Sequence, residues 1–282
     1  PALTSESFLP SERKTHMPHD LDQFVRTAHA LADVAGTVIR PFFRSRLATS
    51  DKSDESPGTI ADRMAERVMR AQLAELHPDH AILGEEFGLS GSTSGYQWTL
   101  DPSDGTRAFI TGRPTFGTLI SLSFEGKPII GIIDQPVTGE RWIGVESRPT
   151  LFRSGFGEPS IFAPVTTRPC GSLAEADLSC TSPEMLEDAP RPVWSRLKAA
   201  AKRVSWGGDC YAYGLLAAGH IDIIAECDMK PWDWSALVPV ITGAGGMVTD
   251  WDGQPLRADG DMTVLATGDR ALHETVVACL HS

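Results

Sequence analysis

The sequence predicts an α+β or α/β protein of two packed lobes, and the order of its helices and strands is the reason. Amphipathic helices come first, over residues 21–43 and from Thr59 to about Pro78. Strands and turns then fill the chain to about residue 165, after which strands and helices alternate. An antiparallel-looking front half followed by an alternating back half indicates two α/β units packed together.

The two leading helices each have apolar residues at helical spacing, which predicts one buried face. In the first helix this face is expected to consist of Leu21, Phe24, Val25, Ala28, Leu31, Ala32, Ala35, Val38, Ile39 and Phe42. In the second helix the core positions are expected to be Ile60, Met64, Val68 and Leu76.

The strands of the front half are expected to be short apolar runs, with a hairpin turn at residues 125–127. These strands are 81–83, 97–100, 118–124, 128–134 and 141–145. Residues 147–171 are rich in Pro, Gly and Ser and mark a boundary or long loop. The expected strands of the back half are 178–180, 203–206, 221–225, 246–249 and 262–266, and its helices are 192–201, 211–218, 233–244 and 271–280.

The chain of 282 residues divides into a loose arm over residues 1–17, an N-terminal lobe over 18–165 and a C-terminal lobe over 166–282. We expect the lobes to form one catalytic unit. A net charge of −12 argues against non-specific binding of nucleic acid. No apolar run is long enough to span a membrane, and the arm lacks the apolar core of a secretory signal.

The five cysteines are odd in number and have no Cys-x-x-Cys spacing. This pattern argues against a disulfide framework and against structural zinc. A reducing cytoplasm is therefore the expected compartment.

The most informative stretch is residues 98–107, where an apolar strand enters a turn with the sequence Asp-Pro-Ser-Asp-Gly-Thr. The turn brings Asp101, Asp104 and the carbonyl of Ser103 toward one point, and three hard oxygens suit Mg²⁺ or Mn²⁺. The N–H groups of Gly105 and Thr106 lie at a helix start, which suits an anion such as phosphate. A cation site beside a phosphate site indicates phosphoryl chemistry, although an ordinary acidic turn explains these ten residues equally well.

Two further acidic turns strengthen the first interpretation. Glu85 and Glu86 end an apolar strand, and Asp233 stands at the start of an apolar helix. Taken singly, Asp233 is a good N-cap and the glutamates are a solvated loop. Those simpler interpretations do not explain why all three acidic turns occur at strand or helix ends.

Together these segments resemble the signatures of the inositol monophosphatase superfamily of Mg²⁺-dependent, lithium-sensitive phosphatases. The Gly-Glu-Glu loop, the Asp-Pro-x-Asp-Gly-Thr turn and the Trp-Asp helix start occur in the family order, over about residues 20–280. The resemblance implies a layered α-β-α-β-α sandwich with its site between the lobes, and a homodimer. It also implies two or three Mg²⁺ ions and a phosphate monoester as substrate.

Residue by residue, the resemblance implies a metal site, a phosphate site and four catalytic residues, which are Thr106, Asp62, Glu85 and Asp104. Thr106 would orient the attacking water through a hydrogen bond to Asp62, and Gly105 and Thr106 would bind the phosphate. Glu86 would support the metal site, and Lys52 would lie near the outermost ion, at a spacing that differs from the family. The implied metal ligands are Glu85, Asp101, the Ser103 carbonyl, Asp104 and Asp233.

The run from Asp104 to Pro114 and the segment around Asp209 resemble the histidinol-phosphatase branch. Asp209 and Glu226 would then face the leaving group, together with Gly208, Cys210 and Asp104, although cap or surface carboxylates remain an alternative for both acids. Histidinol is a cation at neutral pH, so acidic neighbours favour it. The rival functions are an inositol- or sugar-phosphate phosphatase and, in another class, a regulatory partner of transcription machinery.

Overall fold

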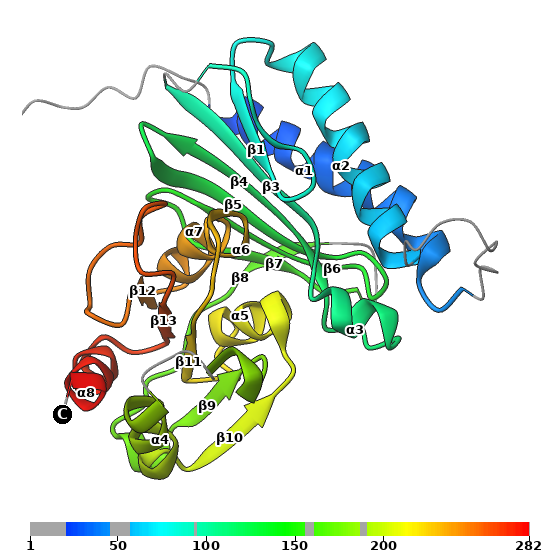
Figure 1. Ribbon diagram of the computed structural model, residues 1–282. Coiled ribbons are helices and arrows are strands. Elements are labelled where there is room, and N and C mark those ends of the chain that lie inside the picture. Colours follow the sequence, from blue (N-terminus) through cyan, green and yellow to red (C-terminus); the bar gives the residue numbers. More distant parts are fainter. Residues whose placement is uncertain (1–20, 46–56, 93–94, 156–160, 187–190, 282) are drawn as a thin grey trace, which may run out of the picture.

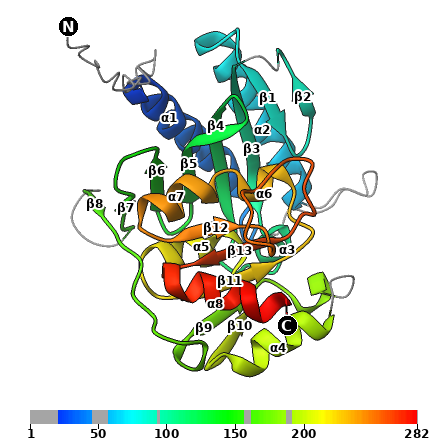
Figure 2. The same cartoon turned by 90° about the vertical axis from the view of Figure 1, so that its left-hand side faces the viewer.

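The computed structural model describes residues 21–45, 57–92, 95–155, 161–186 and 191–281. The expected arm over residues 1–17 and Lys52 lie outside the described residues. Within these ranges the chain forms two mixed sheets with helices on either side (Figures 1 and 2). In the described part of the chain, no helix is long and apolar enough to cross a membrane.

Helices α1 (Leu21–Ile39) and α2 (Pro57–Leu76) form the outer layer beside the first sheet (Figure 1). Helix α1 ends four residues before the predicted end, and a short 3-10 turn, η1 (Arg40–Phe42), follows. Pro41 explains the difference, because its ring lacks the N–H group that an α-helix interior requires. The buried apolar face of α1 packs on the first sheet, as its periodicity predicts.

The first sheet has eight strands in the order β2-β1-β3-β4-β5-β6-β7-β8. Only β1 and β3 pair in parallel; all other neighbours in this sheet are antiparallel. The strands are β1 (Ala81–Gly84), β2 (Gly88–Ser90), β3 (Tyr96–Asp104), β4 (Gly117–Phe124), β5 (Lys127–Gln135), β6 (Glu140–Val145), β7 (Leu151–Arg153) and β8 (Phe162–Pro164). Strands β2, β7 and β8 were not expected, and each is only three residues long.

The second sheet has five strands in the order β10-β9-β11-β13-β12. Its parallel pairs are β9 with β10 and β9 with β11, as an alternating strand–helix pattern predicts. The strands are β9 (Asp177–Cys180), β10 (Arg203–Trp206), β11 (Ile223–Glu226), β12 (Met247–Thr249) and β13 (Val264–Thr267).

Helices of the back half form the middle and outer layers. Helices α5 (Asp209–Ala217) and α7 (Leu237–Gly243) lie between the two sheets, and α4 (Arg191–Ala200) and α8 (Arg270–His281) pack together beyond the second sheet (Figures 1 and 2). The expected helix over 233–244 is in fact two helices, because α6 (Pro231–Trp234) ends before α7 begins. The remaining elements are α3 (Thr106–Ile110), η2 (Leu173–Glu175) and η3 (Pro183–Leu186).

The expected α-β-α-β-α order is confirmed. One apolar core lies between α1 and the first sheet, another lies around α5 and α7, and a third lies beneath α4 and α8. All five cysteines are free. The predicted division into lobes at residue 165 falls just after β8 and stays a prediction.

Candidate active site

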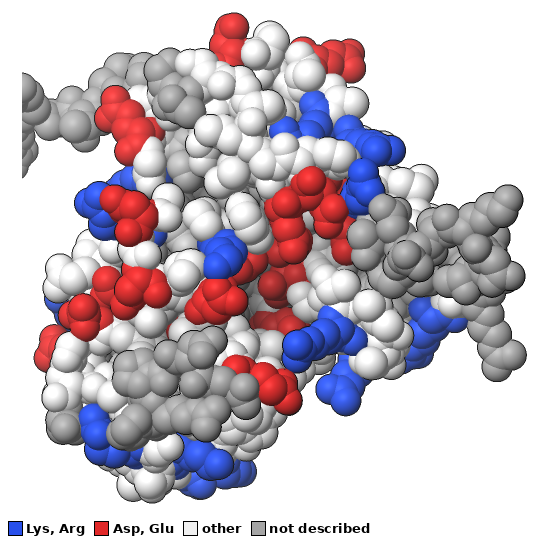
Figure 3. All heavy atoms as spheres, in the orientation of Figure 1, with Lys and Arg blue, Asp and Glu red and all other residues white. Residues whose placement is uncertain are grey.

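Acidic side chains gather around a hollow in one face of the molecule, with Lys and Arg at its edges (Figure 3). Three of them meet where β3 ends: Asp101 and Asp104 come from β3, and Asp233 comes from α6. One carboxylate oxygen of each lies within 4.8 Å of the others, an arrangement that could hold a metal ion. The sequence therefore correctly predicted that distant acidic turns converge.

The end of β3 is shaped by an irregularity in its pairing with β4. Asp101 pairs with Leu119 and Asp104 with Gly117, so the two residues between Asp101 and Asp104 on β3 oppose a single residue, Thr118, on β4. A bulge of this kind redirects side chains at a strand end. The backbone N–H of Ser103 donates to the Asp101 carboxylate at 3.0 Å, which fixes the orientation of that side chain.

Asp233 is held by the start of its own helix. Its carboxylate accepts a hydrogen bond from the backbone N–H of Lys230 at 2.6 Å, and Pro231 occupies the first helical turn. The N-cap is therefore Lys230 and not Asp233 as the simpler interpretation predicted, and Asp233 caps the helix start from the third helical position. The second carboxylate oxygen remains available to the hollow.

Glu85 reaches the same place from β1. Since β1 and β3 are parallel, their carboxyl ends lie at the same edge of the sheet. The backbone N–H of Glu85 donates to the carbonyl of Leu100 at 3.2 Å, and its carboxyl group is hydrogen-bonded to that of Asp101. This contact supports Glu85 as a neighbour of the three aspartates.

The turn that carries Glu85 is supported by Glu66 of α2, a residue that the sequence argument missed. Glu66 is fully buried, accepts a hydrogen bond from the backbone N–H of Glu86 at 2.8 Å and pairs with Arg70 at 2.6 Å. The four-residue spacing of Glu66 and Arg70 was the available signal, but such pairs are usually exposed. Glu86 therefore lies next to Glu85 in this turn and is not one of the three clustered carboxylates.

The site carboxylates raise one another's pKa. Burial raises the pKa of Asp101 well above its usual value, and the charges of Glu85, Asp104 and Asp233 raise it further. Burial, followed by the charge of Asp233, does the same to the pKa of Asp104. The pKa of Asp233 rises to about 7, mainly through burial. Such mutual repulsion is the electrostatic condition that a bound divalent cation relieves.

Asp62 and Thr106 are both at the site, but they do not form the expected hydrogen bond. The Thr106 hydroxyl donates instead to the Ser103 carbonyl at 3.4 Å, a local bond that hydroxyl residues often make at a helix start. Asp62 is 4% exposed, and its Oδ1 has no hydrogen-bond partner in the described part of the chain. Burial, then the charges of Glu85 and Glu86, raise the pKa of Asp62 to about 8.

Gly105 brings the phosphate turn against Asp209. Its φ of 86° is left-handed, and a Cβ atom there would lie 2.8 Å from Cγ of Asp209 and 3.1 Å from Cα of Phe116. Glycine, which has no Cβ atom, adopts the left-handed φ without strain and avoids contact with Asp209 and Phe116. The expected phosphate turn and the expected leaving-group acid are therefore in direct contact.

Asp209 and Glu226 line one hollow with Asp104 and Asp233, with a volume of about 120 Å³. Burial and the charge of Glu226 raise the pKa of Asp209 to about 6, although hydrogen bonding and nearby arginines oppose this. The Asp209 backbone has a φ of 45°, which is a strained conformation for a non-glycine residue. Strain of this kind is common at functional sites.

Thr181 connects these two acids and was not foreseen. Its backbone N–H donates to Oε1 of Glu226 at 2.5 Å, and its hydroxyl accepts a hydrogen bond from the Asp209 N–H at 3.1 Å. The Tyr213 hydroxyl donates to Oε2 of Glu226 at 2.8 Å. Both oxygens of the buried Glu226 are therefore fixed, which argues against the surface-carboxylate alternative.

The remaining predicted residues have different outcomes. Cys210 lines the hollow, and its backbone N–H donates to the Asp104 carboxylate at 2.7 Å. Gly208 stands at the N-cap of α5 and is not among the residues that line the hollow. The substrate contact predicted for Gly208 stays a prediction.

Comparisons with known proteins identify the family to which the chain belongs. The model of the inositol monophosphatase family matches residues 20–282. The chain belongs to the inositol monophosphatase family. It is therefore a phosphoric monoester hydrolase, and its fold is the layered fold of that family.

Two curated relatives and one solved structure are especially similar to the chain. "Bifunctional phosphatase IMPL2, chloroplastic" from Arabidopsis thaliana is 43% identical over 289 residues, covering 99% of this chain and 80% of the relative. The histidinol-phosphatase of Chlorobaculum parvum is 33% identical over 259 residues, covering 91% and 96%. The structure of an inositol monophosphatase from Zymomonas mobilis is 42% identical with a TM-score of 0.85, covering 94% of this chain and 100% of that one.

Proposed function

We propose that the protein hydrolyses L-histidinol phosphate to L-histidinol and phosphate with Mg²⁺ as cofactor. The observation that carries this proposal is the pair of acids, Asp209 and Glu226, that line the hollow beside Asp104. Histidinol has an ammonium group and an imidazole, so carboxylates near the leaving group favour its binding. Similarity to the Chlorobaculum histidinol-phosphatase supports the same substrate.

In this proposal the metal ligands are Glu85, Asp101, the Ser103 carbonyl, Asp104 and Asp233. Their chemistry fits, since hard oxygen donors are preferred by Mg²⁺ and, more loosely, by Mn²⁺. Burial and the neighbouring carboxylates raise the pKa values of Asp101 and Asp104, so a bound cation would relieve the repulsion within the cluster. When bound, Mg²⁺ neutralises phosphoryl oxygens and lowers the pKa of a coordinated water.

The protein's own groups would orient the reactants. The N–H groups of Gly105 and Thr106 would bind the phosphate, and the Thr106 hydroxyl would position the attacking water. Asp62 would accept a hydrogen bond from that hydroxyl, because its buried Oδ1 has no other hydrogen-bond partner among the described residues. For that role the Thr106 hydroxyl would exchange its long bond to the Ser103 carbonyl for a bond to Asp62.

An inositol phosphate is the second candidate substrate, and similarity to the Zymomonas inositol monophosphatase favours it. An inositol ring is neutral and needs hydroxyl partners, so it gains less from a second acid. The deciding experiment compares kcat/KM for histidinol phosphate and inositol 1-phosphate on the purified protein with Mg²⁺. We expect histidinol phosphate to be preferred by about 100-fold, which corresponds to roughly 3 kcal/mol. A preference for inositol 1-phosphate would contradict the proposal.

We further propose a homodimer that acts on small molecules and does not bind nucleic acid. The net charge of −12 supports the last point. A cytoplasmic location agrees with five free cysteines, although the Arabidopsis relative is named as chloroplastic.

A further inference from the structure

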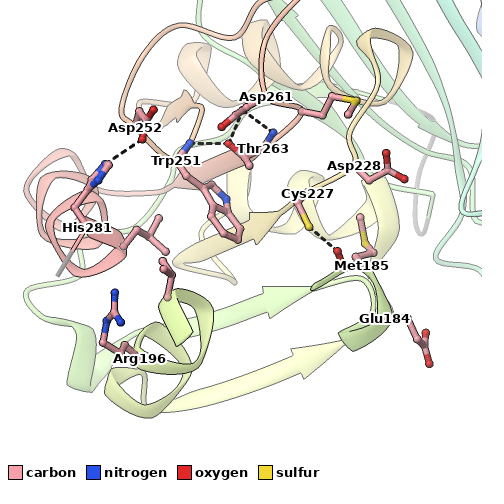
Figure 4. Close-up of a pocket in the computed structure, with 13 residues that line it drawn as sticks. Glu184, Met185, Arg196, Cys227, Asp228, Trp251, Asp252, Asp261, Thr263 and His281 are labelled. Carbon is pink, nitrogen blue, oxygen red and sulfur yellow. Dashed lines mark hydrogen bonds and ion pairs between the residues drawn. The ribbon is translucent and has the colours of Figure 1, made fainter. Parts of the chain in front are cut away.

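A second cavity lies beside the catalytic hollow, among α4, α8 and the segment between β12 and β13 (Figure 4). Its volume is about 800 Å³, which is in the range of pockets that bind small organic molecules. Met185 and Asp228 line both spaces, but none of the proposed metal ligands lines this one. The proposed reaction gives the cavity no role.

The middle of the cavity is apolar and rigid. Figure 4 shows the Trp251 ring pointing into it, and the Trp251 indole N–H donates to the Val264 carbonyl at 3.2 Å, which holds the ring in place. Met185, Val193 and Leu280 complete this part of the wall. A flat aromatic or apolar group would bury surface here without reordering the ring.

Two opposite charges on the wall form no ion pair within the part of the chain that the structure describes. The Arg196 Nε is buried and has no hydrogen-bond partner within the ranges that the structure describes. Asp261 accepts hydrogen bonds from the N–H and hydroxyl of Thr263, at 2.9 and 2.8 Å, and forms no ion pair with a described cation. Figure 4 places Arg196 and Asp261 on opposite sides, with Trp251 between them.

The other charged groups of the wall lie close to partners. Asp228 lies 2.6 Å from Lys230 and Glu184 lies 3.3 Å from Arg107, whereas Asp252 lies 3.2 Å from His281, which is a cation only when it is protonated. Arg196 on one side and the exposed Asp261 on the other therefore have no ion pair among the described residues. A ligand that carries the complementary charges would pair with both.

We propose that this cavity binds an elongated small molecule with an aromatic or apolar middle, an anionic group at one end and a cationic group at the other. The anionic group accepts a hydrogen bond from Arg196, whose buried Nε otherwise stays unpaired at a cost in free energy. The cationic group pairs with Asp261, and the middle packs on Trp251. The site is independent of the proposed phosphatase reaction.

Isothermal titration calorimetry with three matched probes tests this arrangement. The probe para-(aminomethyl)benzoate carries both charges, benzylamine carries only the cation, and para-toluate carries only the anion. We expect the doubly charged probe to bind about tenfold more tightly than either analogue, the effect of one charge-assisted hydrogen bond. Equal affinity for all three probes would overturn the proposal.

Two variants assign the ends of the ligand. Arg196→Gln should weaken para-(aminomethyl)benzoate and para-toluate about tenfold and leave benzylamine unchanged. Asp261→Asn should weaken para-(aminomethyl)benzoate and benzylamine about tenfold and leave para-toluate unchanged. The amide oxygen of the new side chain can still accept the hydrogen bonds from Thr263. If both variants affect the three probes alike, the two-ended site is wrong. Unchanged melting temperature and phosphatase activity would show that both variants are folded.

A third variant and a competition experiment locate the probe. Val193→Phe adds bulk to the apolar wall, so it should reduce the affinity of all three probes together. Saturating inorganic phosphate with Mg²⁺ fills the catalytic hollow and should leave probe affinity within about twofold. Displacement of the probe by phosphate would place it in the hollow and contradict a separate site.

Discussion

At the residue scale, the metal assignment depends on buried carboxylates that repel one another when no cation is present. Asp101 is 1% exposed, and its pKa is raised by burial and by three neighbouring acids. Burying a cluster of like charges costs stability unless a cation compensates for it. Neutralising one of these acids should therefore lower the activity and raise the stability of the metal-free protein.

The variants Asp101→Asn and Asp233→Asn test this opposition. Each should lower kcat by about 10²–10³-fold or more, a loss typical of removing one electrostatic group from a catalytic site. Each should also raise the melting temperature of the metal-free protein by about 2–4 °C, because each removes roughly 1 kcal/mol of repulsion. Steady-state kinetics and calorimetry in EDTA measure both effects. Near-normal turnover in either variant would show that the metal assignment is wrong.

The charge of Asp209 is the residue-scale basis of substrate choice. Asp209→Asn should raise KM for histidinol phosphate about tenfold and change KM for inositol 1-phosphate by less than about twofold, since only the first substrate is cationic. Asp259→Asn removes an exposed acid that pairs with Arg257 outside the hollow, so it is the matched control. Equal effects of Asp209→Asn on both substrates would remove the argument from charge.

At the scale of elements, the turn between β3 and α3 joins the metal site to the substrate side. Gly105→Ala should reduce kcat/KM by about 100-fold or more, because a Cβ atom would push on Asp209 at the phosphate turn. Gly126→Ala is a close control: its φ is 81°, but nothing lies within 4 Å of its Cβ position. Both variants should lose about 1–2 kcal/mol from left-handed strain, and only Gly105→Ala should lose activity. Equal activity of the two variants would contradict this role of the turn.

A second element-scale feature is the polar contact between α1 and β6. Arg141 of β6 donates to Asp33 of α1 at 2.7 Å and to Asp134 of β5 at 2.6 Å, and its Nη1 lies 3.2 Å from Nδ1 of His29. Burial and the charge of Arg141 lower the pKa of His29 to about 4. Neutral His29 can accept a hydrogen bond from Arg141, whereas protonated His29 would repel it.

The pH dependence of stability follows from that contact. His29 has a pKa of about 6.5 in the unfolded chain and about 4 when folded, so its stabilising contribution is complete above pH 6.5 and is lost as pH falls toward 4. Asp33 opposes this shift, and Arg153 and the Phe162 ring also face His29. In denaturant unfolding, His29→Asn should flatten the slope between these pH values by up to about 1.4 kcal/mol per pH unit. An unchanged slope would show that His29 is not linked to folding.

At the scale of the whole molecule, periodicity predicted most elements, and local turns predicted most of the site. Asp101, Asp104 and Gly105 could be predicted from the sequence because they lie within one short segment. Strands β7 and β8 were missed because strands of three residues are too short to have a clear alternation. Glu66, Thr181 and Tyr213 were missed because their roles depend on partners that are distant in sequence.

The fold also explains why one site needs the whole chain. Asp101 and Asp104 come from the first sheet, Asp233 comes from a helix between the sheets, and Glu226 comes from the second sheet. The layers must pack correctly before the carboxylates meet, so metal binding and folding are expected to be linked. At a concentration 100 times its dissociation constant, Mg²⁺ should stabilise the folded protein by about 2.7 kcal/mol.

The most direct test of the proposed cation site is the anomalous scattering of crystals soaked in millimolar Mn²⁺. The expected result is at least one strong peak bound by oxygens of Asp101, Asp104 and Asp233, at about 2.0–2.2 Å. Loss of that peak in crystals of Asp101→Asn would strengthen the assignment. Crystals that take up Mn²⁺ elsewhere while the hollow stays empty would contradict it.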